Sequence, residues 1–326
     1  MAEWLYEAGI GEARAALIEG GIIVEALIEA GGEGLRAGAV CEARLRANRI
    51  AECSDGLQIL LDTAPERMTE GAAARVLVTR ESLSEPGKAK RAKGRVVSAD
   101  TSLTPGPTLA ERIAASGVAV TELLPHAPDA LEEAGWSEIL EQAATGQIPF
   151  AFGMLQISLT PAMTLIDIDG TGPLEQVATE GILAAGRAIR CFGISGSIGI
   201  DVPTLADKAQ RQSVAARLSE TLPGPFEATA INGFGFMQIV RPRKRASLLE
   251  IVQYDRVGSV ARALLRRVKR CGLSGAVTLT ANSRIVAELA AHPDWLAVLG
   301  RQLGGTVTLQ SDPALGMDAG YAAVPS

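Results

Sequence analysis

The segment TLIDIDG, residues 164–170, carries the clearest local pattern in a sequence of 326 residues. Side chains on a β-strand alternate between its two faces, so Leu165, Asp167 and Asp169 are expected on one face and Ile166 and Ile168 on the other. Two carboxylates near the end of an apolar strand are costly to leave without a partner, and a divalent cation is a natural one. The segment therefore predicts a strand with one buried face and a candidate metal site on the other.

A further acidic residue follows a second apolar strand. Asp201 ends the segment SGSIGID, residues 195–201. Neighbouring strands lie about 5 Å apart, so Asp201 would meet Asp167 if the two strands pair. Asp167, Asp169 and Asp201 are then candidates to share one magnesium ion, with water completing its coordination. A second interpretation stays open, because an Asp at a strand end is also suited to capping the turn that follows.

Around these two strands the sequence alternates between strand and helix patterns, which is typical of a layered α/β domain. Strands are expected at 152–159, 162–170, 195–202 and within 227–245, and helices at 174–193 and 204–224. Upstream, residues 1–35 predict a hairpin at Gly20-Gly21, residues 36–95 predict the short strands of a small barrel, and residues 100–147 are mostly helical. Downstream, residues 253–326 predict an amphipathic helix followed by a β–α–β pattern.

The charge is unevenly distributed along the chain. The net charge is −6, yet residues 241–270 hold ten basic and two acidic residues, which is a local charge of +8. A second basic segment, GKAKRAKGR at 87–95, contains Lys88, Lys90, Arg91, Lys93 and Arg95. A solvated surface explains one such run. Two of them in an acidic protein favour contact with a polyanion, of which the phosphate backbone is the usual example.

The composition excludes several classes of protein. A hydrophobic fraction of 47% excludes a mostly disordered chain, and no apolar run reaches the length of a membrane helix. The acidic start lacks the pattern of a signal peptide. The four cysteines are far apart in the sequence, which favours a reducing compartment over a disulfide framework. We therefore expect a cytoplasmic protein with no membrane partner.

The segment DIDGTG, residues 167–172, permits one enzyme hypothesis of its own. It resembles the first motif of haloacid-dehalogenase-type phosphatases, in which Asp167 would be the phosphorylated nucleophile and Asp169 a general acid and base. That family also needs a further acidic motif and a lysine on later strands of a larger doubly wound sheet. Here Asp201 and Asp207 follow soon after the motif, which lies in the middle of the chain.

Three segments, in order, resemble the ribonuclease E/G family. MTLIDIDGTG at 163–172 resembles the family strand that ends AIDVN-S-G, and GISGSIGID at 193–201 resembles its IGGIIVIDF strand. FGFMQIVRPRKRASLLE at 234–250 resembles its GL-E-TRKR-SL segment. The resemblance extends over residues 1–95 and about 148–326.

This resemblance implies a multi-domain α/β (α+β) fold. The parts would be an RNase H-like piece at 1–35, an inserted OB-type RNA-binding barrel at 36–95, the RNase H-like and trimmed sensor remainder at 96–147, a DNase I-like catalytic α/β domain at 148–252, and a small C-terminal α/β domain at 253–326.

The resemblance also implies an endoribonuclease, a phosphodiester hydrolase that cleaves single-stranded RNA to 5′-phosphate and 3′-hydroxyl ends in RNA processing or decay. The family's metal-binding aspartates fall on Asp167 and Asp201, for Mg²⁺ or Mn²⁺. Its phosphate-orienting Asn falls on Asp169, a departure that would strengthen metal binding or repel the substrate phosphate. The residues expected to bind the RNA backbone are Arg243, Lys244 and Arg245 by this resemblance, and Lys88, Lys90, Arg91 and Lys93 by their charge.

Other family features are missing from the sequence. Only Cys271 stands where a zinc-linking CPxC motif is expected, which predicts no zinc and no zinc-linked tetramer, and therefore a monomer or a simple homo-oligomer. The barrel lacks base-stacking aromatic residues, and residues 100–145 lack the motif of the 5′-end sensor. A non-catalytic RNA-binding relative therefore stays a second hypothesis. For Phe234 and Phe236, both core packing and base stacking stay open.

Overall fold

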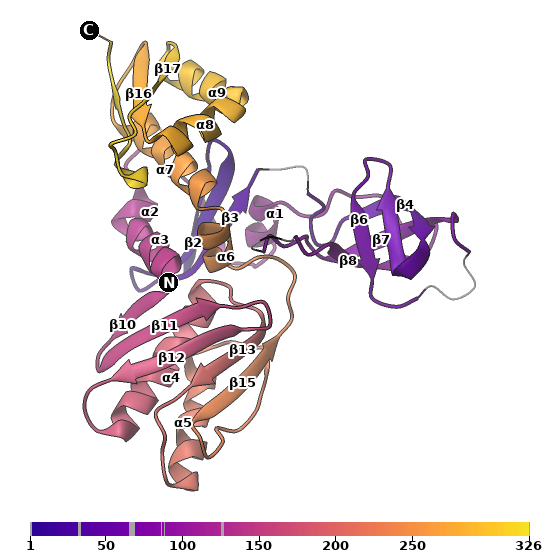
Figure 1. Cartoon of the computed structure of the whole chain (residues 1–326), viewed down its shortest axis with the longest axis vertical. Coiled ribbons are helices and arrows are strands. Elements are labelled where there is room, and N and C mark those ends of the chain that lie inside the picture. Colours follow the sequence, from indigo (N-terminus) through magenta and orange to yellow (C-terminus); the bar gives the residue numbers. More distant parts are fainter. Residues whose placement is uncertain are drawn as a thin grey trace.

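The computed structural model of the chain describes residues 2–31, 34–64, 69–85, 87, 89–124 and 127–325. It is a mixed α/β protein with three sheets and a closed five-stranded barrel (Figure 1). Among these residues, every helix is too short or too polar to cross a lipid bilayer.

The N-terminal sheet has the strand order β3-β2-β1-β9. Its strands are β1 (Glu3–Ala8), β2 (Glu12–Glu19), β3 (Ile22–Ala30) and β9 (Ala119–Glu122). The turn between β2 and β3 is Gly20-Gly21, where both φ angles are positive (60° and 84°), as a two-residue hairpin requires. β9 pairs parallel with β1 although the whole barrel lies between them in sequence. The barrel is therefore an insertion into this sheet.

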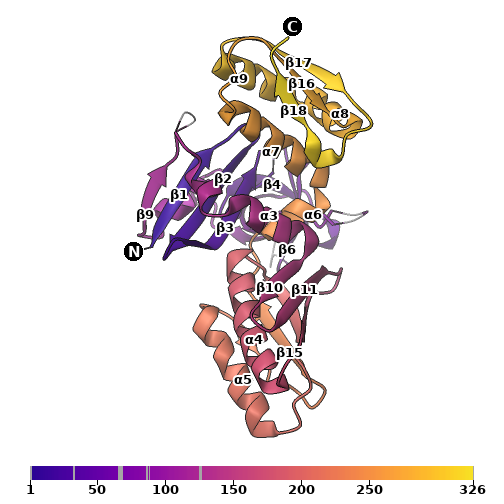
Figure 2. The ribbon, with the colours of Figure 1, turned by 90° about the vertical axis from the view of Figure 1, so that its left-hand side faces the viewer.

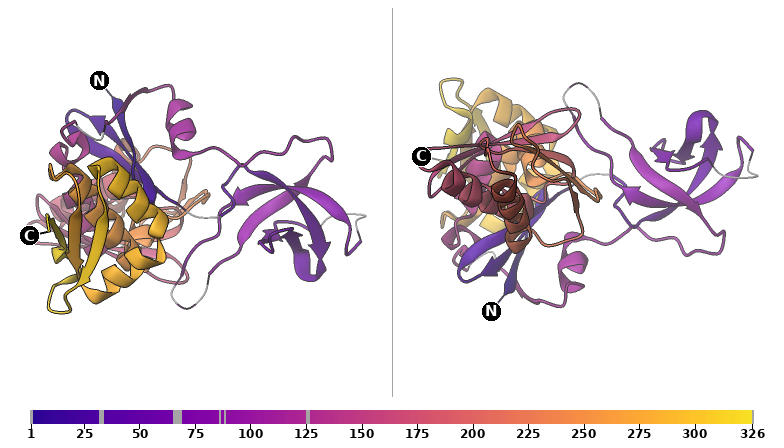
Figure 3. Two further views of the ribbon diagram at one scale, coloured as in Figure 1. Left: turned by 90° about the horizontal axis from the view of Figure 1, so that it is seen from above. Right: turned by 90° about the horizontal axis from the view of Figure 1, so that it is seen from below.

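The barrel closes in the strand order β4-β5-β6-β8-β7. Its elements are β4 (Val40–Arg46), the 3₁₀ turn η1 (Ala47–Arg49), β5 (Ile50–Cys53), β6 (Gln58–Leu61), β7 (Ala73–Arg80) and β8 (Ala92–Val97). Small and branched side chains such as Ala51, Ile59 and Val76 fill its interior and are completely buried. The basic segment at 87–95 overlaps β8, and this strand extends the barrel two residues beyond the predicted boundary at residue 95. Figure 3 shows the barrel projecting to one side of the rest of the molecule.

Short helices surround the N-terminal sheet. They are α1 (Leu109–Ala114), α2 (Ala130–Glu133), α3 (Trp136–Thr145) and α6 (Leu248–Tyr254). Thr108 and Glu111 form a capping box that begins α1, and Ser247 and Glu250 form another that begins α6. Trp136 and Leu131 are completely buried, so α2 and α3 fix the segment that leads into the next sheet.

The central unit is a six-stranded sheet in the order β10-β11-β12-β13-β15-β14. Its elements are β10 (Gln147–Phe150), β11 (Gly153–Leu159), β12 (Thr164–Gly170), α4 (Leu174–Cys191), β13 (Gly196–Asp201), α5 (Lys208–Thr221), β14 (Glu227–Ala228) and β15 (Phe236–Arg241). Figure 2 shows α4 and α5 on one side of this sheet. In the described part of the chain no helix covers the opposite side, which we call the open face.

The C-terminal unit packs helices against a three-stranded sheet of order β17-β16-β18. Its elements are α7 (Arg256–Arg270), β16 (Val277–Ala281), α8 (Ser283–Ala291), α9 (Pro293–Leu303), β17 (Val307–Ser311), η2 (Met317–Ala319) and β18 (Tyr321–Ala323). The parallel pairing of β16 with β17 across α8 and α9 confirms the expected β–α–β pattern. The predicted apolar stripe of α7 is buried in this unit through Leu264, Leu265 and Val268.

Candidate active site

Strand β12 carries the acidic segment with one face buried. Ile166 and Ile168 are 0% and 3% exposed, whereas Asp167 and Asp169 are exposed on the open face. Ile168 packs against Gly181 of α4 so closely that a Cβ at Gly181 would lie 2.2 Å from its Cγ2 atom. This packing fixes which face of β12 is covered, and the alternation predicted from the sequence is confirmed.

Strand β13 brings Asp201 beside Asp167. The two strands pair in parallel, and Asp167 and Asp201 are direct partners in the register. Partners in adjacent parallel strands point to the same face, with their backbones about 4.8 Å apart. The expectation that the two strands are neighbours is therefore confirmed. Asp169 lies one exposed position further along the same face of β12.

The environment of Asp167 opposes its ionisation. The pKa of Asp167 is raised, first by partial burial and then by the negative charges of Asp169 and Asp201; a hydrogen bond to the Ile168 backbone offsets part of this effect. Burial is the larger cause, and no Lys or Arg of the described residues is among the causes of the shift to offset the like charges. A cation supplied from outside would remove the repulsion.

The donor set fits a magnesium ion bound through two carboxylates. In the described part of the chain, no group of three or more His, Cys, Asp and Glu side chains is arranged to hold a metal ion. The arrangement therefore does not support the prediction that all three aspartates share one ion. Magnesium commonly binds one or two carboxylates together with water and substrate phosphates. Asp167 and Asp201, oxygen donors on an exposed face, suit that mode.

Apolar side chains surround the carboxylates on the open face. Phe236 is the register partner of Asp201, and its ring lies over Gly199 of β13 together with a methyl group of Leu165. A Cβ at Gly199 would lie 2.5 Å from the Phe236 ring and 2.9 Å from Leu165. On the other side, Met154 of β11 is the register partner of Asp169 and is 38% exposed. The alternation in TLIDIDG predicts Leu165 on this face, and base stacking stays open for Phe236. Sequence reasoning missed Met154 and the close approach at Gly199, which a glycine inside a strand often signals.

The basic loop that follows β15 lies at the other end of the sheet from the aspartate pair. Gly196 pairs with Arg241 at one end of β13, and Asp201 pairs with Phe236 at the other. At about 3.3 Å per residue, roughly 17 Å separates these ends. Residues 242–247 therefore do not line the metal site.

This basic loop instead joins the sheet to the barrel. The amide of Glu81, just after β7, donates a hydrogen bond of 2.9 Å to the Lys244 carbonyl. Arg245 forms a 3.6 Å ion pair with Glu81, and Arg243 pairs with Glu250. The side chain of Lys244 is exposed.

More arginines gather at this junction than the sequence indicated. Burial, and after it the charge of Arg243, lowers the pKa of Arg80; burial and then the charge of Arg245 lowers the pKa of Arg112. A cavity of about 190 Å³ here is lined by Arg112, Arg241, Lys244 and Arg245, among others. Sequence reasoning missed Arg80 and Arg112, which lie far from the basic run in the chain. Arg112 is paired with Glu29 at 3.3 Å and Arg245 with Glu81, so an anionic ligand would be favoured chiefly by the exposed Lys244.

The basic residues of the barrel are only partly available. Lys90 forms an ion pair with Glu85, and Arg91 donates a 2.8 Å hydrogen bond to Gln58. Lys93 is half-buried on the outer side of β8. Lys88 lies outside the described residues.

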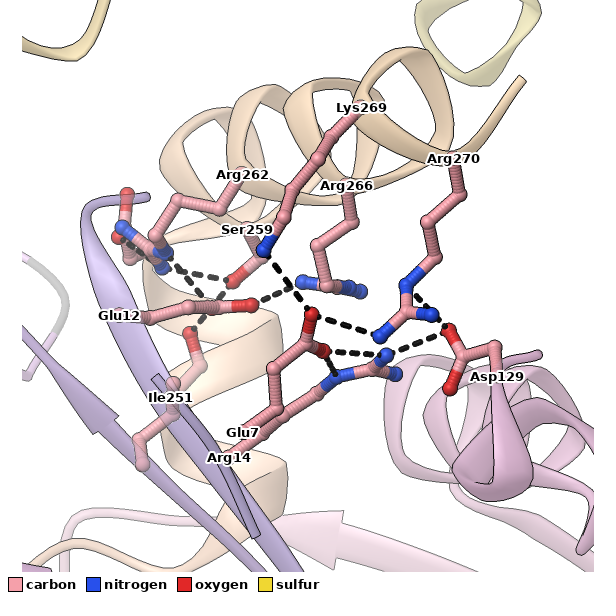
Figure 4. A network of polar contacts seen from close by, with 11 residues as sticks. Glu7, Glu12, Arg14, Asp129, Ile251, Ser259, Arg262, Arg266, Lys269 and Arg270 are labelled. Carbon is pink, nitrogen blue, oxygen red and sulfur yellow. Dashed lines mark hydrogen bonds and ion pairs between the residues drawn. The ribbon is translucent and has the colours of Figure 1, made fainter. Parts of the chain in front are cut away.

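Four of the remaining basic residues of the run 241–270, all on α7, serve a different purpose from the one expected. Figure 4 shows that α7 directs its cations toward carboxylates of the N-terminal sheet and of the segment before α2. We call this set the buried charge network; its members are Glu7, Glu12, Arg14, Asp129, Arg262, Arg266, Lys269 and Arg270. The expectation that this part of the run faces a polyanion is therefore corrected.

The contacts in the buried charge network are close. Glu7, 1% exposed, meets Arg14 at 2.7 Å, Arg270 at 2.8 Å and Lys269 at 3.3 Å. Glu12 meets Arg262 at 3.1 Å and also pairs with Arg266. These cations tie α7 to β1 and β2, so part of the local charge of +8 is neutralised by distant parts of the chain.

A comparison with known proteins gives no family for this chain. No model of a protein family matches it, and neither does any curated protein. The residues of the site are therefore the evidence for function.

Proposed function

We propose that this protein is a metal-dependent endoribonuclease that cleaves single-stranded RNA to 5′-phosphate and 3′-hydroxyl ends. One observation carries the proposal: Asp167 and Asp201 stand side by side on an open sheet face, and no Lys or Arg of the described residues is among the causes that shift the pKa of Asp167. Like charges placed together without compensation are characteristic of a site that receives a cation.

The architecture supports the same proposal. Five barrel strands in the order β4-β5-β6-β8-β7 match the Greek-key order of an OB-type nucleic-acid-binding barrel. The insertion of this barrel between β3 and β9 agrees with a split N-terminal piece of the RNase H-like kind. With the three sequence motifs, these features favour a compact relative of the ribonuclease E/G family, in which residues 148–252 form the DNase I-like catalytic part.

Each residue of the proposed site would have its own role. Asp167 and Asp201 would hold Mg²⁺ or Mn²⁺, which when bound activates water for attack on the phosphodiester and stabilises the leaving oxygen. Asp169, one exposed position further on, would face the substrate phosphate and repel it when ionised. Arg112, Lys244 and Arg245 at the junction would bind phosphates as the RNA passes from the barrel to the open face.

The phosphatase hypothesis loses support from the sheet. Phosphatases that use a DxDGT motif carry it on a doubly wound parallel sheet. In the six-stranded sheet described here, β12 and β13 form the one parallel pair, and the pairs on either side of them are antiparallel. The non-catalytic RNA-binding hypothesis is separated from the nuclease by experiment.

The decisive experiment incubates internally labelled, A/U-rich single-stranded RNA with the purified protein in Mg²⁺, in Mn²⁺ and in EDTA. We expect cleavage that requires metal, leaves 5′-phosphates and disappears in Asp167→Ala and Asp201→Ala. Glu141→Ala, which removes an exposed carboxylate of α3, is the matched control and should cut like the wild type.

Asp169→Asn distinguishes the enzyme hypotheses. A nuclease that normally has Asn at this position should keep or gain activity, whereas a phosphatase that needs Asp169 as its acid should lose it. Binding of RNA without cleavage in either metal would refute the nuclease and support the RNA-binding relative.

A further inference from the structure

One aromatic residue near the strand end that carries Asp201 is held in solvent by a hydrogen-bonded loop. Phe234 is 87% exposed. The Asn232 side chain accepts hydrogen bonds from the amides of Phe234, at 2.8 Å, and Phe236, at 3.1 Å. The carbonyl of Gly235 accepts from Val202, next to Asp201, at 3.0 Å. Core packing is thus excluded for Phe234, and its loop is tied to the strand end that carries Asp201.

The conformation of this loop depends on Gly235. Its φ is +94°, and a Cβ there would lie 2.2 Å from the Val202 carbonyl oxygen. The hydroxyl of Thr204 also donates a 3.4 Å hydrogen bond to the carbonyl of Phe234. An aromatic ring presented from such a fixed loop costs little conformational entropy when it binds a ligand.

Phe234 lies two residues before Phe236, at the strand end that carries Asp201, and so next to an apolar surface on the open face. Phe236 and Leu165 meet over Gly199 beside Asp201, and Met154 lies across from Asp169. We call this set the base platform; its members are Met154, Leu165, Phe234 and Phe236. Leu165 and Met154 are 37% and 38% exposed, so their apolar atoms are open to a ligand. Together these residues flank the carboxylates.

We propose that the base platform binds the nucleobases on either side of the phosphodiester that faces Asp167 and Asp201. This inference rests on the proposed function and adds a base-binding subsite to it. Aromatic side chains on an open sheet face are an established means of stacking bases. Because every base has a π-face, the platform would supply affinity with little sequence preference. It would also replace the stacking residues that the barrel lacks.

The aspartates that the platform flanks favour nucleic acid over a protein partner. A protein that covered this surface would bury Asp167, Asp169 and Asp201 together, which is costly unless its own cations lie against all three. A second copy in a two-fold contact would bring two such sets together. Single-stranded RNA offers apolar bases for the platform, and a metal ion can lie between its phosphate and the carboxylates.

The test measures binding of a fluorescein-labelled single-stranded RNA in EDTA, where the proposed reaction cannot proceed. We expect Phe234→Ala to weaken binding about 5- to 150-fold, the range measured for loss of one stacked base. Phe234→Trp should retain affinity. Tyr321→Ala, which removes another exposed aromatic residue far away on β18, should bind within about twofold of the wild type.

A series of RNAs with a single abasic site then locates the stacked base. At one position the abasic RNA should bind weakly to the wild type, and Phe234→Ala should weaken it no further. An equal effect of Phe234→Ala at every abasic position would contradict stacking, as would wild-type affinity of Phe234→Ala for intact RNA. Binding that depends on Phe234, without cleavage in Mg²⁺ or Mn²⁺, would refute the nuclease and support the base platform. Metal-dependent cleavage with binding that does not depend on Phe234 would support the nuclease and refute the base platform.

Discussion

The buried charge network and the open-face aspartates use the same carboxylate chemistry in opposite ways. In the network, the Glu7 carboxylate is surrounded by three cations within 3.3 Å. On the open face, Asp167 has Asp169 and Asp201 as its charged neighbours. Burial alone raises the pKa of Glu7, but Arg14 and Arg270 bring it below its usual value, whereas the pKa of Asp167 is raised.

This contrast separates structural charge from functional charge. Neutralised charges contribute to the fold and leave little field for a ligand, however basic their stretch of sequence. Charges without a partner lower the free energy of unfolding slightly, and they can bind an ion or a ligand of opposite charge. The four predictions below test this distinction in order of decreasing effect.

Asp167→Asn should abolish cleavage without harming the fold. Loss of a metal ligand removes several kcal/mol of transition-state stabilisation, so we expect cleavage to fall about 10³-fold or more. Thermal denaturation should show an unchanged or slightly higher Tm. Folding raises the pKa of Asp167 above its usual value of 3.8, so ionisation of this group lowers the free energy of unfolding as pH rises through the folded pKa. At neutral pH the wild type therefore carries this loss of stability, and the uncharged Asn does not. A large drop in Tm would show that the aspartate is structural.

Glu7→Gln should have the opposite consequence. It leaves Arg14, Lys269 and Arg270 without their shared carboxylate, so we expect unfolding in urea to require about 3–5 kcal/mol less free energy. The pKa of Glu7 is lowered, so its contribution is present above about 4.5 and is lost as pH falls through the folded pKa. The difference between variant and wild type should therefore shrink in acid. Equal stability at pH 7 would refute a structural role for the network.

Gly199→Ala should disturb the open face while leaving the aspartates in place. Its methyl group would press on Phe236 and Leu165, and such overpacking costs about 1–3 kcal/mol. We expect a lower urea midpoint together with weaker RNA binding. Gly193→Ala is less suitable as a control because its φ is positive, and Gly233 belongs to the loop that holds Phe234. Gly316→Ala in the C-terminal unit, where nothing lies within 4 Å of the added Cβ, is the better control. Tight RNA binding by Gly199→Ala would argue against the platform.

Lys244→Ala should have the smallest effect on the fold and a measurable one on binding. The residue is exposed, so stability should change by no more than about 0.5 kcal/mol. If Lys244 neutralises one phosphate, the slope of log affinity against log salt should fall by about one. Lys269→Ala, which removes a buried cation of the same run, should instead destabilise the protein. An unchanged salt slope in Lys244→Ala would remove this lysine from the RNA path.

Much of the site could be predicted from local sequence. The alternation of TLIDIDG sets which residues share a face, and the apolar strand before Asp201 sets where that residue emerges. The hairpin at Gly20-Gly21 and the stripe of α7 follow from equally local patterns. Such features depend on strand and helix periodicity, which acts over a few residues.

The position and the partner of each charged side chain could not be predicted from local sequence. The run 241–270 reads as one basic surface, yet the fold divides it between a junction with the barrel and a buried network. The partners of its cations, Glu7, Glu12 and Glu81, lie more than a hundred residues away in the sequence. Sequence alone determined the elements, their faces and the candidate aspartates. Only the tertiary structure decided which charges are neutralised and which stay open to a ligand, because electrostatic energy depends on distances in space and on burial.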